Sequence, residues 1–202
     1  MHNLLFLMRR TRESGQKLKK FMIYLMGVIM IGSLFGVVFF GFGTASADSI
    51  KYKDFRFANK GNFWSTIVND REALFTYLPT DVELIDADDD VINRLRGLVQ
   101  IDITSDYNDT FKEPIALAQF QMGVTLNNFN VFVRKGFTDE NENNFPIIKC
   151  GYSTSFVPVI YFKSSNATRV YFQSDCIIAE ASNPADVIRI KDRLVYGVLG
   201  II

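Results

Sequence analysis

The chain has 202 residues and carries 22 acidic and 22 basic side chains, so its formal net charge is zero. The charge is unevenly placed, because the first 20 residues hold six Lys and Arg against one Glu, which leaves 16 basic and 21 acidic residues for the rest. A predominantly acidic body argues against nucleic acid as a partner.

The first predicted element is an apolar run over residues 21–43 that contains no charged side chain. As a helix this run would rise about 34 Å, which is enough to span a hydrocarbon core of about 30 Å. The basic residues before it place the N-terminus in the cytoplasm. The sequence therefore predicts a single-pass cell-membrane protein, with a cytoplasmic tail (1–20), a transmembrane helix in the lipid bilayer (21–43), a linker (44–49) and an extracytoplasmic domain (50–202).

Two alternatives concern this N-terminal segment. Ala45-Ser46-Ala47 has the small-x-small form of a signal-peptide cleavage site, although the 23-residue run is longer than the usual apolar region of roughly 7 to 15 residues. Cleavage there stays open. Gly32 and Gly36 form a small-xxx-small pair through which two such helices could approach as a homodimer.

The exported domain is predicted to begin with a three-stranded meander. Residues 50–57 alternate between apolar and polar side chains as a strand does, and turn-forming residues 59–62 follow. Residues 63–68 and 73–78 then flank a second turn as a hairpin.

The acidic run over residues 81–90 resembles a calcium loop at first sight. An EF-hand needs Gly at its sixth position and Glu at its twelfth, and this run has Val91 and Gly97 there. The acids instead precede an amphipathic helix predicted over residues 91–96, where negative charge is favoured.

The remainder of the domain is predicted to contain one sheet and two more helices. Strand patterns occur at 98–103 and 130–133 around a helix at 113–126, and four short strands follow at 147–150, 157–162, 169–172 and 176–179. The last helix begins with Asn183 as its cap and Pro184 in its first turn. Its stripe of Val187, Ile190 and Leu194 predicts core packing, with Lys191 and its charged neighbours mostly on the other side. The predicted fold class is thus an α+β (α/β) domain with a meander, a mixed sheet and about three helices.

Cys150 and Cys176 are the only cysteines, and their place in an exported domain predicts a disulfide. The domain has no histidine, which excludes Cys-His and Ser-His catalysis and makes a zinc site untenable. No cofactor or metal is predicted. Asn108 and Asn166 each begin an Asn-x-Thr triplet in a predicted surface turn, as glycan acceptors do.

From residue 98 onward the order of strands and helices resembles a thioredoxin-like fold, with Val157-Pro158 entering a strand as the cis-proline of that fold does. The segment after the first strand, residues 104–107, lacks the cysteine pair of the family. The resemblance therefore implies a fold without implying oxidoreductase activity.

The main functional hypothesis is a membrane-anchored, non-enzymatic module that binds an envelope protein or helps to assemble a complex. An exported enzyme, acting by thiol-disulfide exchange or by hydrolysis with paired carboxylates, is the first alternative. A pilin-like subunit is the second alternative, although pilins carry an acid early in their apolar helix and residues 21–47 have none.

Overall fold

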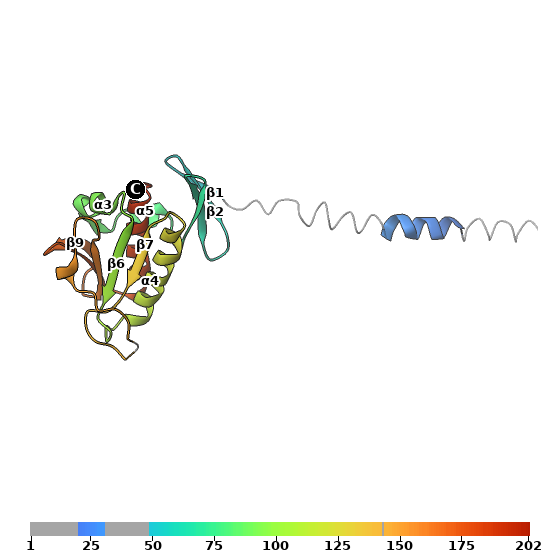
Figure 1. Cartoon of the computed structure of the whole chain (residues 1–202). Helices are drawn as coiled ribbons and strands as arrows, with labels where there is room; N and C mark the ends of the chain where they lie inside the picture. The colour runs from blue at the N-terminus through green and yellow to red at the C-terminus, as the bar shows by residue number, and fades with distance from the viewer. Residues whose placement is uncertain (1–19, 31–48, 143) are drawn as a thin grey trace, which may run out of the picture. The chain divides into compact units, whose positions relative to one another are not determined.

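The computed structural model describes residues 20–30, 49–142 and 144–202. The chain divides after Ala47, and each part is described by itself. The first part shows a helix over residues 20–30, and the second part holds the folded domain (Figure 1).

The predicted transmembrane helix is wrong. Throughout the described parts of the chain, no helix combines the length and the hydropathy needed to cross a membrane. The helix over residues 20–30 rises about 16 Å, roughly half of a hydrocarbon core. Residues 31–43, and with them Gly32 and Gly36, lie outside the described residues, as does Ala45-Ser46-Ala47.

The domain opens with four strands rather than three. The antiparallel meander consists of β1 (Ser49–Tyr52), β2 (Phe55–Asn59), β3 (Trp64–Val68) and β4 (Arg71–Phe75). The predicted strand over residues 50–57 is in fact a hairpin that turns at Lys53, whose φ is +50°. Asn69 and Asp70 both have positive φ, as a two-residue type I′ hairpin loop requires.

A six-stranded sheet follows, in the order β5-β9-β10-β8-β6-β7. Adjacent strands pair in parallel from β7 through β6 and β8 to β10, β9 is antiparallel to β10, and β5 is parallel to β9. The strands are β5 (Asp86–Ala87), β6 (Gln100–Ser105), β7 (Phe132–Lys135), β8 (Val159–Ser164), β9 (Arg169–Gln173) and β10 (Cys176–Ala181).

Four α-helices belong to the domain, one more than predicted. They are α2 (Pro79–Val82), α3 (Asp89–Leu95), α4 (Lys112–Asn127) and α5 (Pro184–Val198). Asn183 caps α5 as predicted, since its side chain accepts a hydrogen bond from the Asp186 amide. The predicted strand at 147–150 is replaced by a bridge at Ile147 and a short 3₁₀ turn, η1 (Cys150–Tyr152).

One feature of the thioredoxin-like resemblance, the cis-proline to which Pro158 was compared, is not observed. All described peptide bonds are trans, including the one before Pro158.

Helices α4 and α5 cover one face of the six-stranded sheet. Ile101, Ile103 and Ile160 on that face share one core with Ile115 and Met122 of α4. The same core includes much of α5 and the inner side of the meander, where Phe75 stacks on Tyr196 at 3.9 Å between ring centroids. Helix α5 therefore lies at the centre of the domain.

This central position buries the charged side chains that we expected α5 to expose. Lys191 is 2% exposed and Asp192 is fully buried. Asp192 binds the Lys191 ammonium, and its other oxygen accepts hydrogen bonds from the amides of Thr76 and Tyr77 at 3.0 and 2.9 Å. Tyr196 donates a further hydrogen bond to the Tyr77 carbonyl at 2.7 Å. These contacts attach the end of β4, and so the meander, to α5.

The residue before the last one is anchored in the domain. Ile201 is 1% exposed, and its amide bonds to the Tyr196 carbonyl. Ile201 therefore belongs to the core of the domain.

We predict that Asp192→Asn lowers the free energy of unfolding by about 3–5 kcal/mol, because it leaves the buried Lys191 ammonium without its counterion. Urea unfolding of the full-length chain measures the change. The exposed Asp54→Asn in the β1–β2 turn is the matched control and should cost less than about 0.5 kcal/mol. Equal effects of the two variants would show that the buried pair does not hold the meander in place.

Candidate functional site

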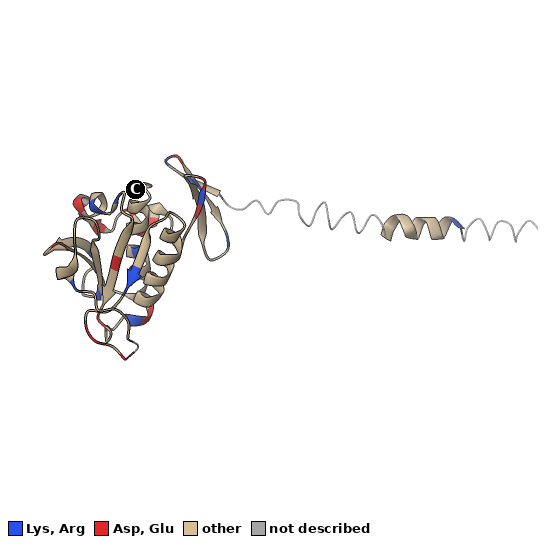
Figure 2. Ribbon diagram, in the orientation of Figure 1, with Lys and Arg blue, Asp and Glu red and all other residues tan. Residues whose placement is uncertain are grey.

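Helix α4 has apolar side chains on both its buried and its exposed faces. Ile115, Met122 and Leu126 pack into the core. No charged residue follows Glu113 in the helix, and the ribbon of α4 in Figure 2 is uncoloured beyond its first turn. A surface helix usually presents a polar face to water, so a helix without one indicates a binding surface.

The outward face of α4 displays Leu117, Phe120 and Val124, which are 48%, 58% and 50% exposed. Their spacing of three and then four residues aligns them in a row along the helix. The row is about two turns long.

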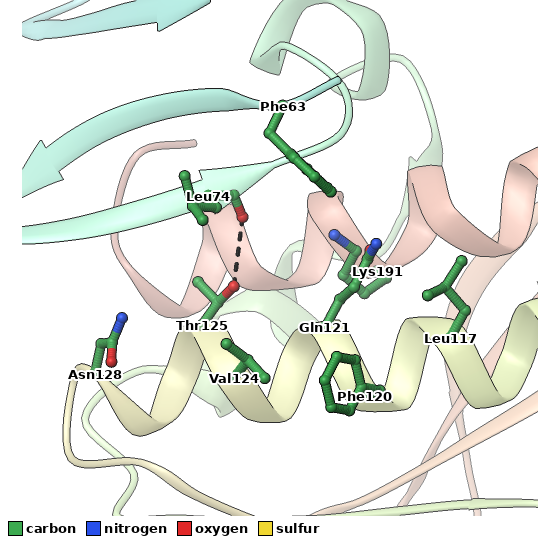
Figure 3. Close-up of a pocket in the computed structure, with 9 residues that line it drawn as sticks. All are labelled: Phe63, Leu74, Leu117, Phe120, Gln121, Val124, Thr125, Asn128 and Lys191. Carbon is green, nitrogen blue, oxygen red and sulfur yellow. Dashed lines mark hydrogen bonds between the residues drawn. The ribbon is translucent and has the colours of Figure 1, made fainter. Parts of the chain in front are cut away.

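On one side of this row, the β3–β4 hairpin forms a groove with α4. Phe63 and Leu74 supply the hairpin wall, and the groove has a volume of about 270 Å³ (Figure 3). Three hydrogen bonds hold this wall against α4: Thr125 Oγ1 donates to the Leu74 carbonyl at 3.4 Å, Asn128 Nδ2 to the Glu72 carbonyl at 3.5 Å, and Arg71 Nη1 to the Asn128 carbonyl at 2.7 Å. We call this feature the α4 groove.

Polar atoms lie within the α4 groove. Figure 3 shows Gln121 and Lys191 beside one another between Phe63 and Leu117. Lys191 is held by Asp192, whereas the buried Gln121 Oε1 has no hydrogen-bond partner. An unpaired buried acceptor costs about 1–3 kcal/mol.

On the other side of the row, the apolar surface continues over β7. Phe132 and Phe145 are 58% and 50% exposed, and with Phe120 and Val124 they line a shallow cavity of about 560 Å³. Phe120 therefore stands between the two hollows, with the Lys135 ammonium 5.7 Å from its ring centroid. We refer to the whole surface as the α4 patch, which consists of Phe63, Leu74, Leu117, Phe120, Val124, Phe132 and Phe145.

The opposite face of the six-stranded sheet carries two ion-pair clusters beside a small apolar cluster. Asp102 on β6 accepts hydrogen bonds from Arg134 on β7 and from Gln100. Glu180 on β10 accepts from Lys163 at 2.9 Å, Arg169 at 2.7 Å and the Tyr171 hydroxyl at 3.1 Å.

The second cluster changes the acidity of its carboxyl group. Burial alone raises the pKa of Glu180, which is 4% exposed, but the hydrogen bonds from Lys163, Arg169 and Tyr171 outweigh it and lower the pKa to about 2. A carboxylate so firmly ionised is suited to holding strands together. It is poorly suited to proton transfer near neutral pH.

The cysteines predicted to pair are joined in the structure. A disulfide links Cys150 of η1 to Cys176 at the start of β10, with 5.0 Å between their Cα atoms. Cys176 is fully buried and packs with Ile148, Val159 and Ile178 on the face of the sheet opposite α4 and α5. The bond therefore fastens the segment between β7 and β8 to the middle of the sheet.

Asn108 lies in the β6–α4 loop and Asn166 in the β8–β9 turn, and both are exposed. Glycosylation at either one stays a prediction. Within residues 20–30, 49–142 and 144–202, no three Asp, Glu, Cys or His side chains are grouped closely enough to hold a metal ion.

The α4 patch was missed in the sequence. The helix predicted at 113–126 is confirmed as α4 (Lys112–Asn127), but its exposed apolar face was not predicted. A signal was present, because Leu117, Phe120 and Val124 alternate around the helix with the core residues and no charge separates them.

Comparison with known proteins finds no match to a protein-family model, a curated protein or a solved structure. Function is therefore argued from the geometry of this chain.

The Glu180 cluster predicts a defined dependence of stability on pH. Since the pKa of Glu180 is about 2 in the folded chain and about 4.5 otherwise, its stabilisation is complete above pH 4.5 and is lost as the pH falls towards 2. We predict that Glu180→Gln lowers the free energy of unfolding by about 2–3 kcal/mol at pH 7.

Urea titrations of both chains between pH 7 and pH 2 measure this difference, which should shrink below pH 4.5. The exposed Glu140→Gln is the control and should change little at any pH. A difference that stays constant over the whole range would contradict the assignment.

Proposed function

We propose that the domain is a non-enzymatic binding module and that the α4 patch receives an apolar helix of a partner protein. The observation that carries the proposal is the row of Leu117, Phe120 and Val124, about half exposed on a helix that has no charge after Glu113. Exposed apolar surface of this kind costs solubility unless a partner covers it.

The shape of the patch favours a helix as the bound element. The row follows the axis of α4 at the spacing of three and four residues that an amphipathic helix also presents. Phe120 and Phe132 supply large aromatic contacts, which carry much of the binding energy in protein interfaces. A partner side chain can enter the α4 groove beside Phe63.

We further propose that the domain works outside the cytoplasm. The Cys150–Cys176 disulfide supports this location, because such bonds persist in oxidising compartments and are rare in the cytosol. We therefore expect the partner to be an envelope protein.

Cross-linking tests the proposal. A photoreactive phenylalanine analogue replaces Phe120 in the full-length chain in its native cells, and Leu84, 90% exposed in the segment after α2, is the control position. We expect position 120 to give a discrete adduct with another polypeptide and position 84 to give none. Adducts at neither position, or the same adducts at both, would overturn the proposal.

A matched pair of substitutions then tests whether the α4 patch determines the adduct. Val124→Asp introduces a charge into the patch and should lower the yield at least about tenfold, a loss of about 1.4 kcal/mol or more. Val99→Asp makes the same change at a side chain that is 73% exposed outside the patch, and it should have no effect. An adduct of twice the chain mass would identify a second copy as the occupant and refute a separate partner.

A further inference from the structure

The charged side chains that line the α4 patch are all basic. Within the described residues, the α4 groove and the shallow cavity over β7 are lined by Lys191, Arg134 and Lys135 and by no Asp or Glu. Figure 2 shows this positive charge on β7, beside the uncoloured helix α4. The chain after residue 20 has more acidic than basic side chains, so the patch is a locally basic surface on an acidic domain.

Two of these three cations are already paired inside the domain. Lys191 is bound to Asp192, and Arg134 is bound to Asp102 on the neighbouring strand β6. Lys135, in contrast, forms no ion pair with any residue that the structure describes. Its charge is therefore the one that the patch can offer to a bound partner.

The Lys135 side chain reaches from β7 onto helix α4. Its ammonium lies 5.7 Å from the ring centroid of Phe120, and a Cβ added at Gly123 would be 4.0 Å from the same nitrogen. The side chain is partly exposed and lines the shallow cavity. Phe120 and Gly123 are neighbours on the helix surface, so the ammonium lies at the border of the row formed by Leu117, Phe120 and Val124.

A partner that covers Phe120 also removes water from the Lys135 ammonium. Removing a charge from water is expensive unless an opposite charge pairs with it. The attraction between the cation and the Phe120 ring offsets only part of this cost. A helix that presents nothing but apolar side chains would therefore bind this surface poorly.

We propose that the helix received by the α4 patch carries an Asp or Glu at the border of its apolar stripe, and that this carboxylate pairs with Lys135. The inference rests on the proposed function, because it states the chemistry of the partner at the same site. The apolar residues of an amphipathic helix follow the row on α4, and a residue at the border of that stripe then lies over β7. The same ammonium repels helices with a basic border, so it also determines which helices are rejected.

Charge reversal in the native cells tests the inference. In the chain with the photoreactive analogue at position 120, Lys135→Glu should lower the yield of the adduct at least about tenfold, because two like charges then face each other. Lys51→Glu makes the same change at an exposed position of β1 and should have no effect. An unchanged yield in Lys135→Glu would overturn this inference and leave the proposed function standing, whereas absence of the adduct from the unsubstituted chain would overturn both.

Three synthetic helical peptides test the charge of the partner directly. All have the same stripe of Leu at positions i, i+3 and i+7, and their border positions are Glu, Gln or Lys, which have similar helix propensities. In fluorescence anisotropy with the full-length chain, the Glu peptide should bind at least about tenfold more tightly than the Lys peptide, and added salt should reduce this preference. Equal affinities of these two peptides, or no binding of the Glu peptide, would overturn the inference.

The neutral variant Lys135→Met distinguishes the charge of Lys135 from a structural role. It removes the ammonium but keeps an apolar side chain against Phe120. The Gln peptide should therefore bind this variant more tightly than it binds the unsubstituted chain, and the Glu peptide should bind it more weakly. An equal loss of affinity for both peptides would show that Lys135 only supports the surface, and it would refute the ion pair.

Discussion

The arrangement of the domain depends on one buried carboxylate. Asp192 is at the centre of α5 and binds two backbone amides at the end of β4 as well as the neighbouring Lys191. Burying a charge is expensive unless it is paired and hydrogen-bonded, and here Lys191 pairs the charge while the two amides add hydrogen bonds. Because the meander meets the rest of the domain here, the same contacts decide where Phe63 and Leu74 stand relative to α4.

Lys191 links this attachment to the surface. Its ammonium is bound to Asp192, and its side chain also lines the α4 groove. The groove is consequently built from three parts of the chain that are distant in sequence: the hairpin, α4 and the middle of α5. None of the three forms a groove without the other two, so no local sequence pattern predicts the groove.

Much of the local structure could be predicted from the sequence, because local rules determine it. The cap at Asn183, the strands β8 to β10 and helix α4 follow from turn residues and apolar periodicity. The β1–β2 hairpin was missed because Lys53 adopts a positive φ that nothing in its residue type requires. The burial of Lys191 and Asp192 was missed because it depends on the meander packing against α5, and the parallel course of β6, β8 and β10 is likewise a property of the whole fold.

The α4 patch also depends on the whole fold, so local sequence patterns do not predict it. Apolar periodicity identifies a helix but does not tell which of two apolar faces the sheet covers. Gln119 and Gln121 read as ordinary polar positions of a helix, and only the packing around them leaves a donor and an acceptor unpaired. The disulfide could be predicted from the sequence, because two cysteines in one domain allow a single pairing.

The short strands at the borders of the six-stranded sheet have a consequence for how copies of the protein meet. At one border β5 has two residues, and at the other β7 has four, two of which are Arg134 and Lys135. Short edge strands, and the positive charge on β7, are known protections against strand-by-strand stacking of sheets into aggregates. The exposed apolar surface of α4 makes such protection useful. Copies that meet through this surface cannot then readily extend into fibrils by pairing their strand edges.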